Sequence, residues 1–588
     1  MKKLLFILGV TSTIAFTSCE DMFTPSIENF LEIETAYTRP LYAQGILLNG
    51  YNRVPTNGWS FNDVATDDAV TNDRASNYLK IATGQWTAMN NPLEQWRNSR
   101  SAIQYINNFL SIQDKVEWSS SAPINSMFND RMKGEALGLR ALFMFHLLQT
   151  HAGKTSSGEV LGIPIVLEYE TSESDFNKPR ATFEECMQQI YADLDKADEL
   201  LPLDFEDISN ASQIPAKYQS LGVNLTDYNQ VFGEKFRLRM TKRISQAIRA
   251  KAALLAASPA FNDGNTAKWE QAANYAGNVI QQKGGISGVD PQGALFYLPA
   301  SVNQMESGKN TAEIIWRVDR GDLSSSLEAD HFPPTLFGRG RLNPTQNLVD
   351  AFPMANGYPI NDAASGYNAN SPYDNRDPRL KNYILVNGST SGVNNTAINT
   401  AVNSPTNDGL NKVETSTRTG YYMRKLLRQD VNLNPSNVSG QYHVTPRLRM
   451  TEIYLAYAEA ANEAWGPTGR GSFSFSAYDI IKAIRTRAGV GTTNGDPYLE
   501  QVKNNKDQMR QLIRNERRLE LCFEGFRFWD LRRWNENLTI PAQGISIENN
   551  TYNVITVENR VFEPYMQYGP IPYSEILKYN NLQQNNGW

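Results

Sequence analysis

The segment NERRLELCFEGFRFWDLRRW, residues 515–534, constrains the fold more than any other part of the sequence. Together with Leu512, its residues Leu519 and Phe523 fall on one face of a helix, which predicts packing against a neighbouring element. Gly525 can end that helix, because glycine readily adopts the left-handed conformation found after a helix. Two pairs have the spacing of ion pairs along a helix: Arg517 with Glu520, and Glu524 with Arg527.

The aromatic residues of the same segment suit a packing role. Trp529 and Trp534 follow the predicted helix and are expected to fill the space beside neighbouring helices. Charges and rings at helical spacing usually belong to a scaffold, so residues 515–534 are interpreted as structural and not as a chemical site. A turn held by arginine and aspartate pairs is predicted for Asp374–Leu380, in preference to a metal or phosphate site.

Helical periodicity recurs in blocks along the chain, whereas strand-like alternation is rare and brief. Two blocks are rich in alanine, and small side chains at helical spacing let neighbouring helices approach closely, as in stacked tetratricopeptide helix pairs. No regular repeat period is visible, so the repeats are expected to be degenerate. The predicted helices are residues 93–110, 131–151, 182–201, 241–257, 268–282, 448–465, 477–487 and 507–523.

Between residues 284 and 445 the composition changes to Asn, Ser, Gly, Pro and Tyr, with few helical runs. Turn signals such as Asn-Asp-Gly at 407–409 mark loops, and embedded rings such as Tyr358 favour loops that are packed on a scaffold. We therefore predict a mainly α fold. It is a degenerate tetratricopeptide-like helix-pair scaffold at 92–283 and 446–536, with long irregular loop insertions at 284–445 and minor β hairpins.

The chain begins with the features of an export signal. Two lysines precede an apolar stretch that is too short to span a bilayer, and Ser18 precedes Cys19 as in a lipoprotein cleavage site. We predict a signal peptide at 1–18 and a lipidated tether at 19–26, with Cys19 as the lipidated residue. Acyl chains on this cysteine would hold the protein on a membrane without crossing it. The alternatives are an ordinary signal peptide with a coincidental cysteine, or a buried helix.

The composition narrows the function classes. The chain of 588 residues has a formal net charge of −6, which disfavours nucleic acid as a partner. Beyond Cys19, only Cys186 and Cys522 remain, and both are interpreted as core residues, with a disulfide between them left open. No CxxC pair supports zinc or thiol chemistry. An aromatic content of 11% suits either packed loops or a sugar-binding face.

Several strings resemble the SusD/RagB family of outer-surface nutrient-binding lipoproteins. The most specific is residues 515–534, which resembles the family signature NERRxELxFEGxRxxDLxRW. The other strings follow in the family's order up to the last residue, so one binding module would cover 27–588. They are Gly134-Glu135-Ala136, Leu139-Arg140-Ala141, Gly162-Ile163-Pro164, Arg180-Ala181-Thr182, Leu200-Leu201-Pro202, Asp374–Leu380, Glu452–Ala460, Pro570–Ile576 and Asn585–Trp588.

The resemblance implies a mechanism of nutrient capture. Similar proteins lie on the outer leaflet of the outer membrane, cap a TonB-dependent transporter of the SusC type, and hold an oligosaccharide until it is delivered. The pair Glu20-Asp21 resembles the acidic surface-export signal of similar lipoproteins. We therefore expect a cell-surface lipoprotein that binds glycans, and a peptide-binding member of the same family is the alternative.

The stretch 59–96 combines the residue types that grip sugars: rings for the apolar sugar faces, and carboxylate, amide or guanidinium groups for the hydroxyls. In similar starch-binding proteins the corresponding loops supply an acidic residue, an arginine, a tryptophan and an asparagine. A solvated loop anchored by Trp86 is the alternative, and Trp96 is expected to start a helix and face inward. Secondary candidates are Tyr297, Phe332 and Phe337. The predicted ligand contacts are Asp67, Asp68, Arg74, Trp86 and Asn90.

Catalysis is not expected. The sequence contains no HExxH, GxSxG or Walker motif. His146 and His151 are five residues apart and do not share a helical face well, while His331 and His443 are isolated, so each is interpreted as structural. A surface glycoside hydrolase is a less favoured alternative, because spatially paired carboxylates cannot be excluded from sequence, and an adhesin is another. The sequence therefore predicts no catalytic residue, no metal and no cofactor.

Overall fold

The computed structural model describes residues 33–55, 61–305 and 308–588. The predicted signal peptide at 1–18, the tether at 19–26 and the lipidated Cys19 lie outside the described residues, as does Trp59. Within the described ranges, no helix is long and apolar enough to cross a membrane.

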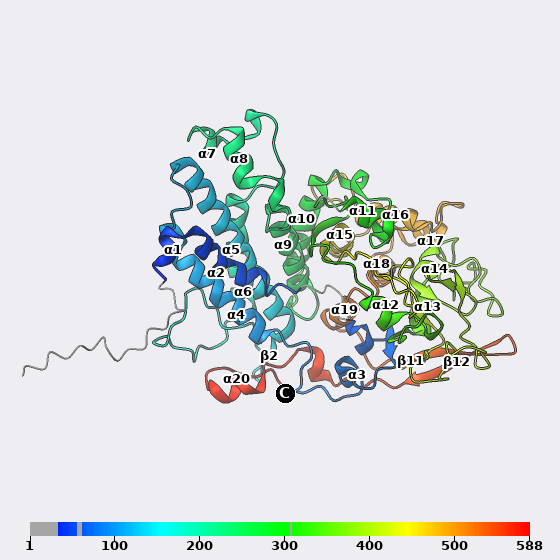
Figure 1. Ribbon diagram of the computed structural model, residues 1–588. Coiled ribbons are helices and arrows are strands. Elements are labelled where there is room, and N and C mark those ends of the chain that lie inside the picture. The colour runs from blue at the N-terminus through cyan, green and yellow to red at the C-terminus, as the bar shows by residue number, and fades with distance from the viewer. Residues whose placement is uncertain (1–32, 56–60, 306–307) are drawn as a thin grey trace, which may run out of the picture.

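The larger part of the fold is a stack of antiparallel helices that pack in sequence order (Figure 1). Helix α4 packs on α5, α5 on α6, α9 on α10, and α10 on α15. Their bounds are α1 Thr35–Thr38, α2 Pro40–Tyr51, α4 Trp96–Ile112, α5 Ala122–His151, α6 Phe183–Leu200, α9 Lys242–Ala257, α10 Ala267–Gln282, α15 Met450–Trp465, α16 Ala477–Ala488 and α18 Lys506–Glu520. All eight predicted helices are present.

The alanine-rich helices are packed closely, as predicted. Ala247, Ala250 and Ala253 of α9 are buried, and so are Ala458 and Ala461 of α15. Helix α10 lies between these two helices and contacts both. Small side chains remove the bulk that would otherwise keep helix axes apart, so the three helices form one continuous apolar core with α4, α5 and α6.

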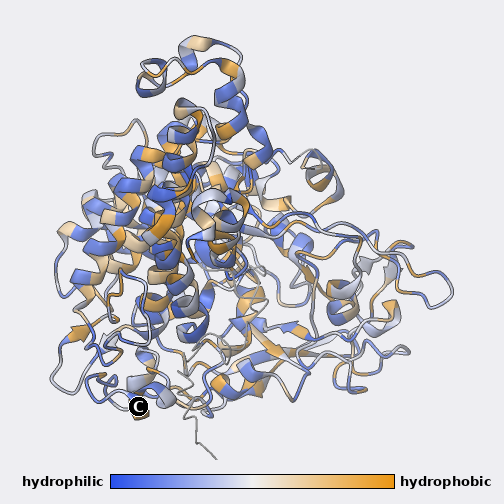
Figure 2. Ribbon diagram, turned by 60° about the vertical axis from the view of Figure 1, so that its left-hand side comes forward, coloured by the Kyte–Doolittle hydropathy of each residue, from blue (hydrophilic) through white to orange (hydrophobic). Residues whose placement is uncertain are grey.

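The remaining chain forms shorter elements beside the stack, and Figure 2 shows its long connecting loops at the periphery. The short helices are α3 Asn77–Ala82, α7 Ala216–Gln219, α8 Leu225–Phe232, α11 Pro299–Gln304, α12 Ser326–His331, α13 Gln346–Ala351, α14 Pro378–Tyr383, α17 Pro497–Val502, α19 Arg527–Arg533 and α20 Tyr573–Lys578. A second apolar cluster, which includes Phe352, Tyr383 and Tyr421, holds the loop-rich region together. The region is therefore folded, as the embedded rings predict.

The named strands form two-stranded antiparallel sheets, and the longest of these is a hairpin near the C-terminus. The strands are therefore minor elements of a mainly helical fold, which confirms the predicted fold class. The pairs are β1 Ala69–Thr71 with β5 Leu342–Pro344, β2 Gly153–Lys154 with β3 Val160–Leu161, β4 Ile314–Arg317 with β10 Pro446–Arg449, β6 Ile384–Leu385 with β9 Tyr422–Met423, β7 Thr390–Ser391 with β8 Thr396–Ala397, and β11 Ala542–Glu548 with β12 Thr551–Glu558.

The signature segment folds differently from the prediction at its centre. Helix α18 ends at Glu520, and the chain then turns through Phe523 and Gly525, which both have positive φ, before α19 begins. Phe523 therefore does not continue the helical face. Because the turn brings α19 back against α18, Arg517 donates to Asp530 (2.7 Å) and does not pair with Glu520.

The second predicted ion pair is also wrong, since Glu524 and Arg527 both find partners elsewhere. Glu524 accepts from Arg449 (2.7 Å), and Arg527 donates to Asp67 (2.9 Å). Trp534 is buried and donates to Glu459, in line with the predicted packing role.

Two smaller predictions concern a turn and the cysteines. Asp377 caps α14 and binds Arg379 (2.6 Å), which is the predicted arginine and aspartate turn. Cys186 and Cys522 are buried free thiols, so the disulfide alternative is not realised. In the part of the chain that the structure describes, no group of three or more His, Cys, Asp or Glu side chains is arranged to hold a metal ion.

Candidate ligand-binding site

The predicted acidic contacts lie in the interior. Asp67 and Asp68 follow the short 3₁₀ turn at Asn62–Ala65 and are both buried. Arg527 binds Asp67 through two hydrogen bonds of 2.9 Å, and Arg518 binds Asp68 at 2.6 Å. These contacts tie the loop to the signature segment, so both carboxylates bind arginines of the protein itself. Oδ2 of Asp68 is buried without a hydrogen-bond partner among the described residues.

Trp86 is also internal, with 2% of its surface exposed. Its indole donates to Asn91 (3.0 Å), and its ring meets Trp588 and Phe528 edge-on at centroid distances of 4.8 and 5.9 Å. The guanidinium of Arg532 lies 5.3 Å from the ring centroid. These neighbours match the alternative interpretation, in which Trp86 anchors a loop.

The other predicted contacts are dispersed. Arg74 and Asn90 are exposed, and Arg74 lines a hollow beside β12 that it shares with Arg418. Of the secondary candidates, Tyr297 and Phe332 are buried, whereas Phe337 is 55% exposed. The structure therefore does not gather the five predicted contacts into one site, and their direct role in binding stays a prediction.

A cavity of about 260 Å³, here called the central pocket, lies between the helical stack and the signature segment. The stretch 59–96 does contribute one wall, through Asn62, Tyr78, Pro92, Leu93 and Gln95. Helices α5 and α9 form a second wall, and β4, β10 and α15 a third. The end of α18, the turn after it and helix α19 close the pocket with Arg517, Glu524, Gly525, Phe526, Trp529, Asp530 and Arg533.

Three aromatic side chains of the pocket are only partly buried: Tyr78, Phe526 and Trp529. Trp529 is supported from behind by Phe528, whose ring lies edge-on at 5.5 Å. The ammonium of Lys251 lies 5.7 Å from the Phe526 ring centroid. Rings held in this way offer flat apolar surfaces beside charged groups, which is the combination that sugars require.

Several polar atoms of the pocket lack a partner among the described residues. Lys251 binds one oxygen of Glu452 (2.8 Å), and the other oxygen, Oε2, is buried and unbonded. The same holds for Nδ1 of His146, Nη1 of Arg517 and Oδ1 of Asn62. Since a buried polar group without a hydrogen bond costs about 1–3 kcal/mol, this set is expected to bind water or a ligand.

His146 is neutral at physiological pH. Burial, helped by the positive charge of Lys251, lowers its pKa to about 3. A neutral imidazole has one nitrogen that donates and one that accepts, which suits a hydroxyl group. The pocket thus combines an acceptor on Glu452, a donor on Arg517 and an uncharged imidazole.

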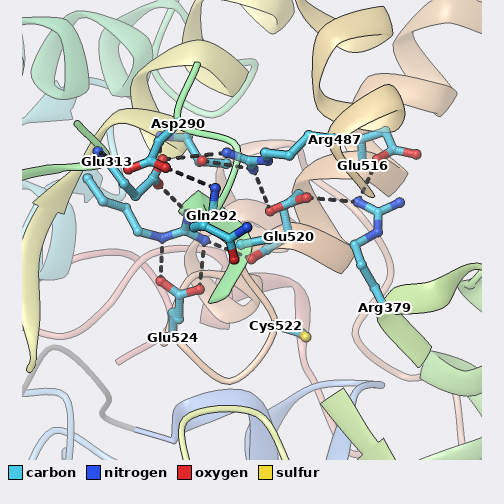
Figure 3. Close-up of polar contacts among 12 residues, drawn as sticks. Asp290, Gln292, Glu313, Arg379, Arg487, Glu516, Glu520, Cys522 and Glu524 are labelled. Carbon is cyan, nitrogen blue, oxygen red and sulfur yellow. Dashed lines mark hydrogen bonds and ion pairs between the residues drawn. The ribbon is translucent and has the colours of Figure 1, made fainter. Parts of the chain in front are cut away.

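The floor of the pocket is held by a network of buried charges (Figure 3). Arg449 binds Glu313 and Glu524 (both 2.7 Å), and Arg487 binds Glu520 (3.0 Å). Burial alone would raise the pKa of Glu520, but Arg487 and its neighbouring cations lower it to about 2. Glu520 therefore stays ionised, and the network fixes the turn after α18, which carries Phe526.

Asp63 provides a pH-dependent test of this architecture. Burial, followed by the charge of Asp68, raises the pKa of Asp63 to about 7, while its Oδ1 accepts from the Phe523 amide (3.2 Å). The folded pKa lies above the unfolded value of about 3.9, so the folded state binds the proton more tightly. Wild-type stability therefore falls as the pH rises from the unfolded pKa to the folded pKa of Asp63. We therefore compare the free energies of unfolding of Asp63→Asn and wild type. We expect the difference, variant minus wild type, to be about 2 kcal/mol more positive at pH 8 than at pH 5. Urea unfolding at both pH values measures this, and an equal difference at both would contradict it.

The residues that sequence reasoning missed are Lys251, Glu452, Phe526 and the pocket-facing side of Trp529. One signal was available, because Lys251 and Glu452 are charges within alanine-rich helices whose other positions are mostly buried. Such a charge requires a partner, and here each is the other's partner.

The comparisons with known proteins cover most of the chain. Residues 312–588 match the family model described as "SusD family", and residues 35–221 match the model described as "Starch-binding associating with outer membrane". A curated relative from Formosa agariphila, a "SusD-like protein", is 27% identical over 281 residues, which is 45% of this chain and 46% of that protein. A second from the same organism is 33% identical over 101 residues, or 17% and 19% of the two chains. The matched segments thus span less than half of these relatives.

Solved structures share the whole fold. A SusD-like carbohydrate-binding protein from Bacteroides fragilis has 21% identity and a TM-score of 0.68, covering 93% of this chain and 100% of that chain. A laminarin-binding SusD-like protein has 18% identity and a TM-score of 0.56, covering 94% and 100%. Surface glycan-binding protein A from Bacteroides fluxus has 16% identity and a TM-score of 0.57, with the same coverages. The signature segment, the two matched family regions and the common fold together place this chain in the SusD/RagB family.

Proposed function

We propose that this protein binds glycans at the outer-membrane surface and that the central pocket is its ligand site. The observation that carries the proposal is the set of partly exposed rings next to buried polar atoms that have no hydrogen-bond partner among the described residues. A sugar suits the rings and the polar atoms alike. Its apolar faces stack on the rings, while its hydroxyl groups donate hydrogen bonds to the polar atoms and accept hydrogen bonds from them. The carbohydrate-binding names of the structural neighbours support the same class of ligand.

The five predicted contacts take two roles in this proposal. Arg74 and Asn90 have exposed side chains and are proposed as outer contacts of a long ligand. Asp67, Asp68 and Trp86 are proposed as supports, since their burial and internal contacts leave little for a ligand in this conformation.

We further propose that the protein is a cell-surface lipoprotein anchored through Cys19, with 27–588 as one module. It passes its oligosaccharide to a SusC-like TonB-dependent transporter in the outer membrane and performs no catalysis. Peptide binding is the second candidate, and surface glycoside hydrolysis is a less favoured third.

Binding to a panel of ligands tests the proposed function. We expect the chain without residues 1–19 to bind at least one plant, host or microbial oligosaccharide in titration calorimetry, and to release no reducing sugar from it. Binding of peptides with no glycan response would favour the second candidate. Release of reducing sugar would contradict the non-catalytic role.

The proposed partner has its own test. Extraction of the full-length lipoprotein from membranes in mild detergent is expected to co-purify a barrel of the SusC type. Purification of the lipoprotein alone under conditions that preserve other outer-membrane complexes would contradict delivery to such a transporter.

A further inference from the structure

Arg447 is a cation in the central pocket that has no carboxylate partner among the described residues. It lies on β10 and is half-buried. Its Nε donates to the backbone oxygen of Pro55 (3.2 Å), and its guanidinium lies 4.8 Å from the ring centroid of Trp316. These two contacts fix the direction of the side chain while the terminal nitrogens remain available to an acceptor.

The other cations of the pocket are all neutralised. Each has a carboxylate within ion-pair distance, so none offers an uncompensated charge. The pairs are Lys251 with Glu452 (2.8 Å), Arg449 with Glu524 (2.7 Å), Arg517 with Asp530 (2.7 Å), and Arg533 with Glu459 (2.5 Å), so that each cation has a carboxylate of its own. Among the Lys and Arg side chains that line the pocket, Arg447 is therefore the one without a carboxylate partner among the described residues.

Two buried arginines elsewhere show what a structural arginine without a carboxylate looks like. Arg180 donates to several backbone carbonyls, including those of Gly162 and Leu161 (both 2.8 Å). Arg532 is buried against Trp86 and donates to the carbonyl of Gln567 (3.0 Å). Arg447, in contrast, is only half-buried and lines a cavity, so its charge faces the space that a ligand would fill.

Partial burial makes an anionic partner favourable at this position. Loss of solvent lowers the pKa of Arg447 to about 10, which still leaves the group charged at neutral pH. A charge that has lost part of its hydration gains more from an opposite charge than an exposed one does. The planar guanidinium can bind a carboxylate or sulfate group through two parallel hydrogen bonds.

We propose that the glycan bound in the central pocket carries an acidic group, a carboxylate or a sulfate ester, which Arg447 recognises. The inference rests on the proposed glycan-binding function and adds the chemical class of the ligand. The rings of Phe526 and Trp529 bind sugar faces, and Arg447 selects acidic glycans over neutral ones of similar size.

Titration calorimetry with three oligosaccharide probes separates the outcomes. They are oligogalacturonate for the carboxylate, a carrageenan oligosaccharide for the sulfate, and a malto-oligosaccharide as the neutral reference. The wild-type chain without residues 1–19 is expected to bind at least one acidic probe more tightly than the neutral probe. The acidic probe that binds identifies which anion the pocket takes.

Variants of Arg447 test the residue itself. We expect Arg447→Gln to weaken binding of the preferred acidic probe at least about tenfold. Arg447→Lys is expected to lose less affinity, because lysine keeps the positive charge but lacks the planar guanidinium that donates two parallel hydrogen bonds. The matched control is Arg97→Gln, at an exposed arginine outside the pocket, which is expected to bind as wild type does. Thermal unfolding confirms that each variant is folded.

The failures are distinguishable. Tighter binding of the neutral probe, or an Arg447→Gln variant within twofold of wild type, would overturn this inference and leave glycan binding in place. Absence of binding to all three probes and to the wider glycan panel would overturn the proposed function as well.

Discussion

Replacement of Arg379 by methionine is expected to lower the free energy of unfolding by about 3–5 kcal/mol. Arg379 is buried and binds Asp377 (2.6 Å), Glu516 (2.9 Å) and Glu520 (3.1 Å). Figure 3 shows its contacts with the two glutamates. Methionine fills much of the same volume, so the loss comes mainly from Asp377, which would stay buried without its cation. Glu516 and Glu520 keep Arg485 and Arg487 and lose one of two cations each. Urea unfolding followed by circular dichroism measures the change.

An exposed arginine provides the matched control. Arg339 pairs with Asp330 at 3.1 Å, but 61% and 49% of these side chains are exposed. Because solvent screens such a pair, Arg339→Met is expected to change stability by less than about 1 kcal/mol. Equal effects of the two substitutions would show that the buried network does not hold the fold together.

Replacement of Trp529 by alanine is expected to weaken glycan binding roughly thirtyfold, which corresponds to about 2 kcal/mol. The ring is a partly exposed face in the central pocket, and Phe528 holds it in place. Its removal takes away a stacking surface without opening the charge network beneath. Calorimetry with the glycan identified in the panel gives the affinity.

A tryptophan outside the pocket controls for loss of bulk. Trp118 is also half-buried, stacks on Phe128 at 6.2 Å, and is not among the residues that line the pocket. We expect Trp118→Ala to retain wild-type affinity. Similar losses in both variants would indicate general destabilisation and would argue against Trp529 as a contact residue.

The helical stack was predictable because its helices carry strong local signals. The predicted and observed ends of α9 and α15 coincide at Ala257 and Trp465, where apolar periodicity runs through the helix. Helix α5 begins at Ala122, earlier than the predicted residue 131, because its first turns are polar and show little periodicity. Helix α2 was missed because its own apolar residues are spread around most of its circumference. They therefore give no single apolar stripe that would predict a helix.

The ion pairs of the signature segment were not predictable from spacing. Arg518 binds Asp67 and Asp68 across about 450 positions of sequence, and Glu524 binds Arg449 from another element. Each local pair within a helix stabilises by only about 0.2–0.5 kcal/mol, so a buried tertiary partner easily displaces it. The turn at Phe523 and Gly525 decides which partners meet.

The location of the site depends on the same long-range contacts. The stretch 59–96, which was predicted to contact sugars, contributes one wall of the central pocket, but Trp86 packs against the C-terminal Trp588 and does not line the cavity. Lys251 and Glu452, from helices about 200 residues apart, meet inside it. Residue types alone indicate a sugar site, whereas their side-chain directions come only from the fold.

The structure of the chain without residues 1–19, crystallised with its preferred oligosaccharide, tests the central claim most directly. The account predicts sugar density in the central pocket, with a ring on Trp529 and an acidic group within hydrogen-bond distance of Arg447. Ordered sugar elsewhere, for example beside Arg74 and β12, with the central pocket holding only water, would contradict it.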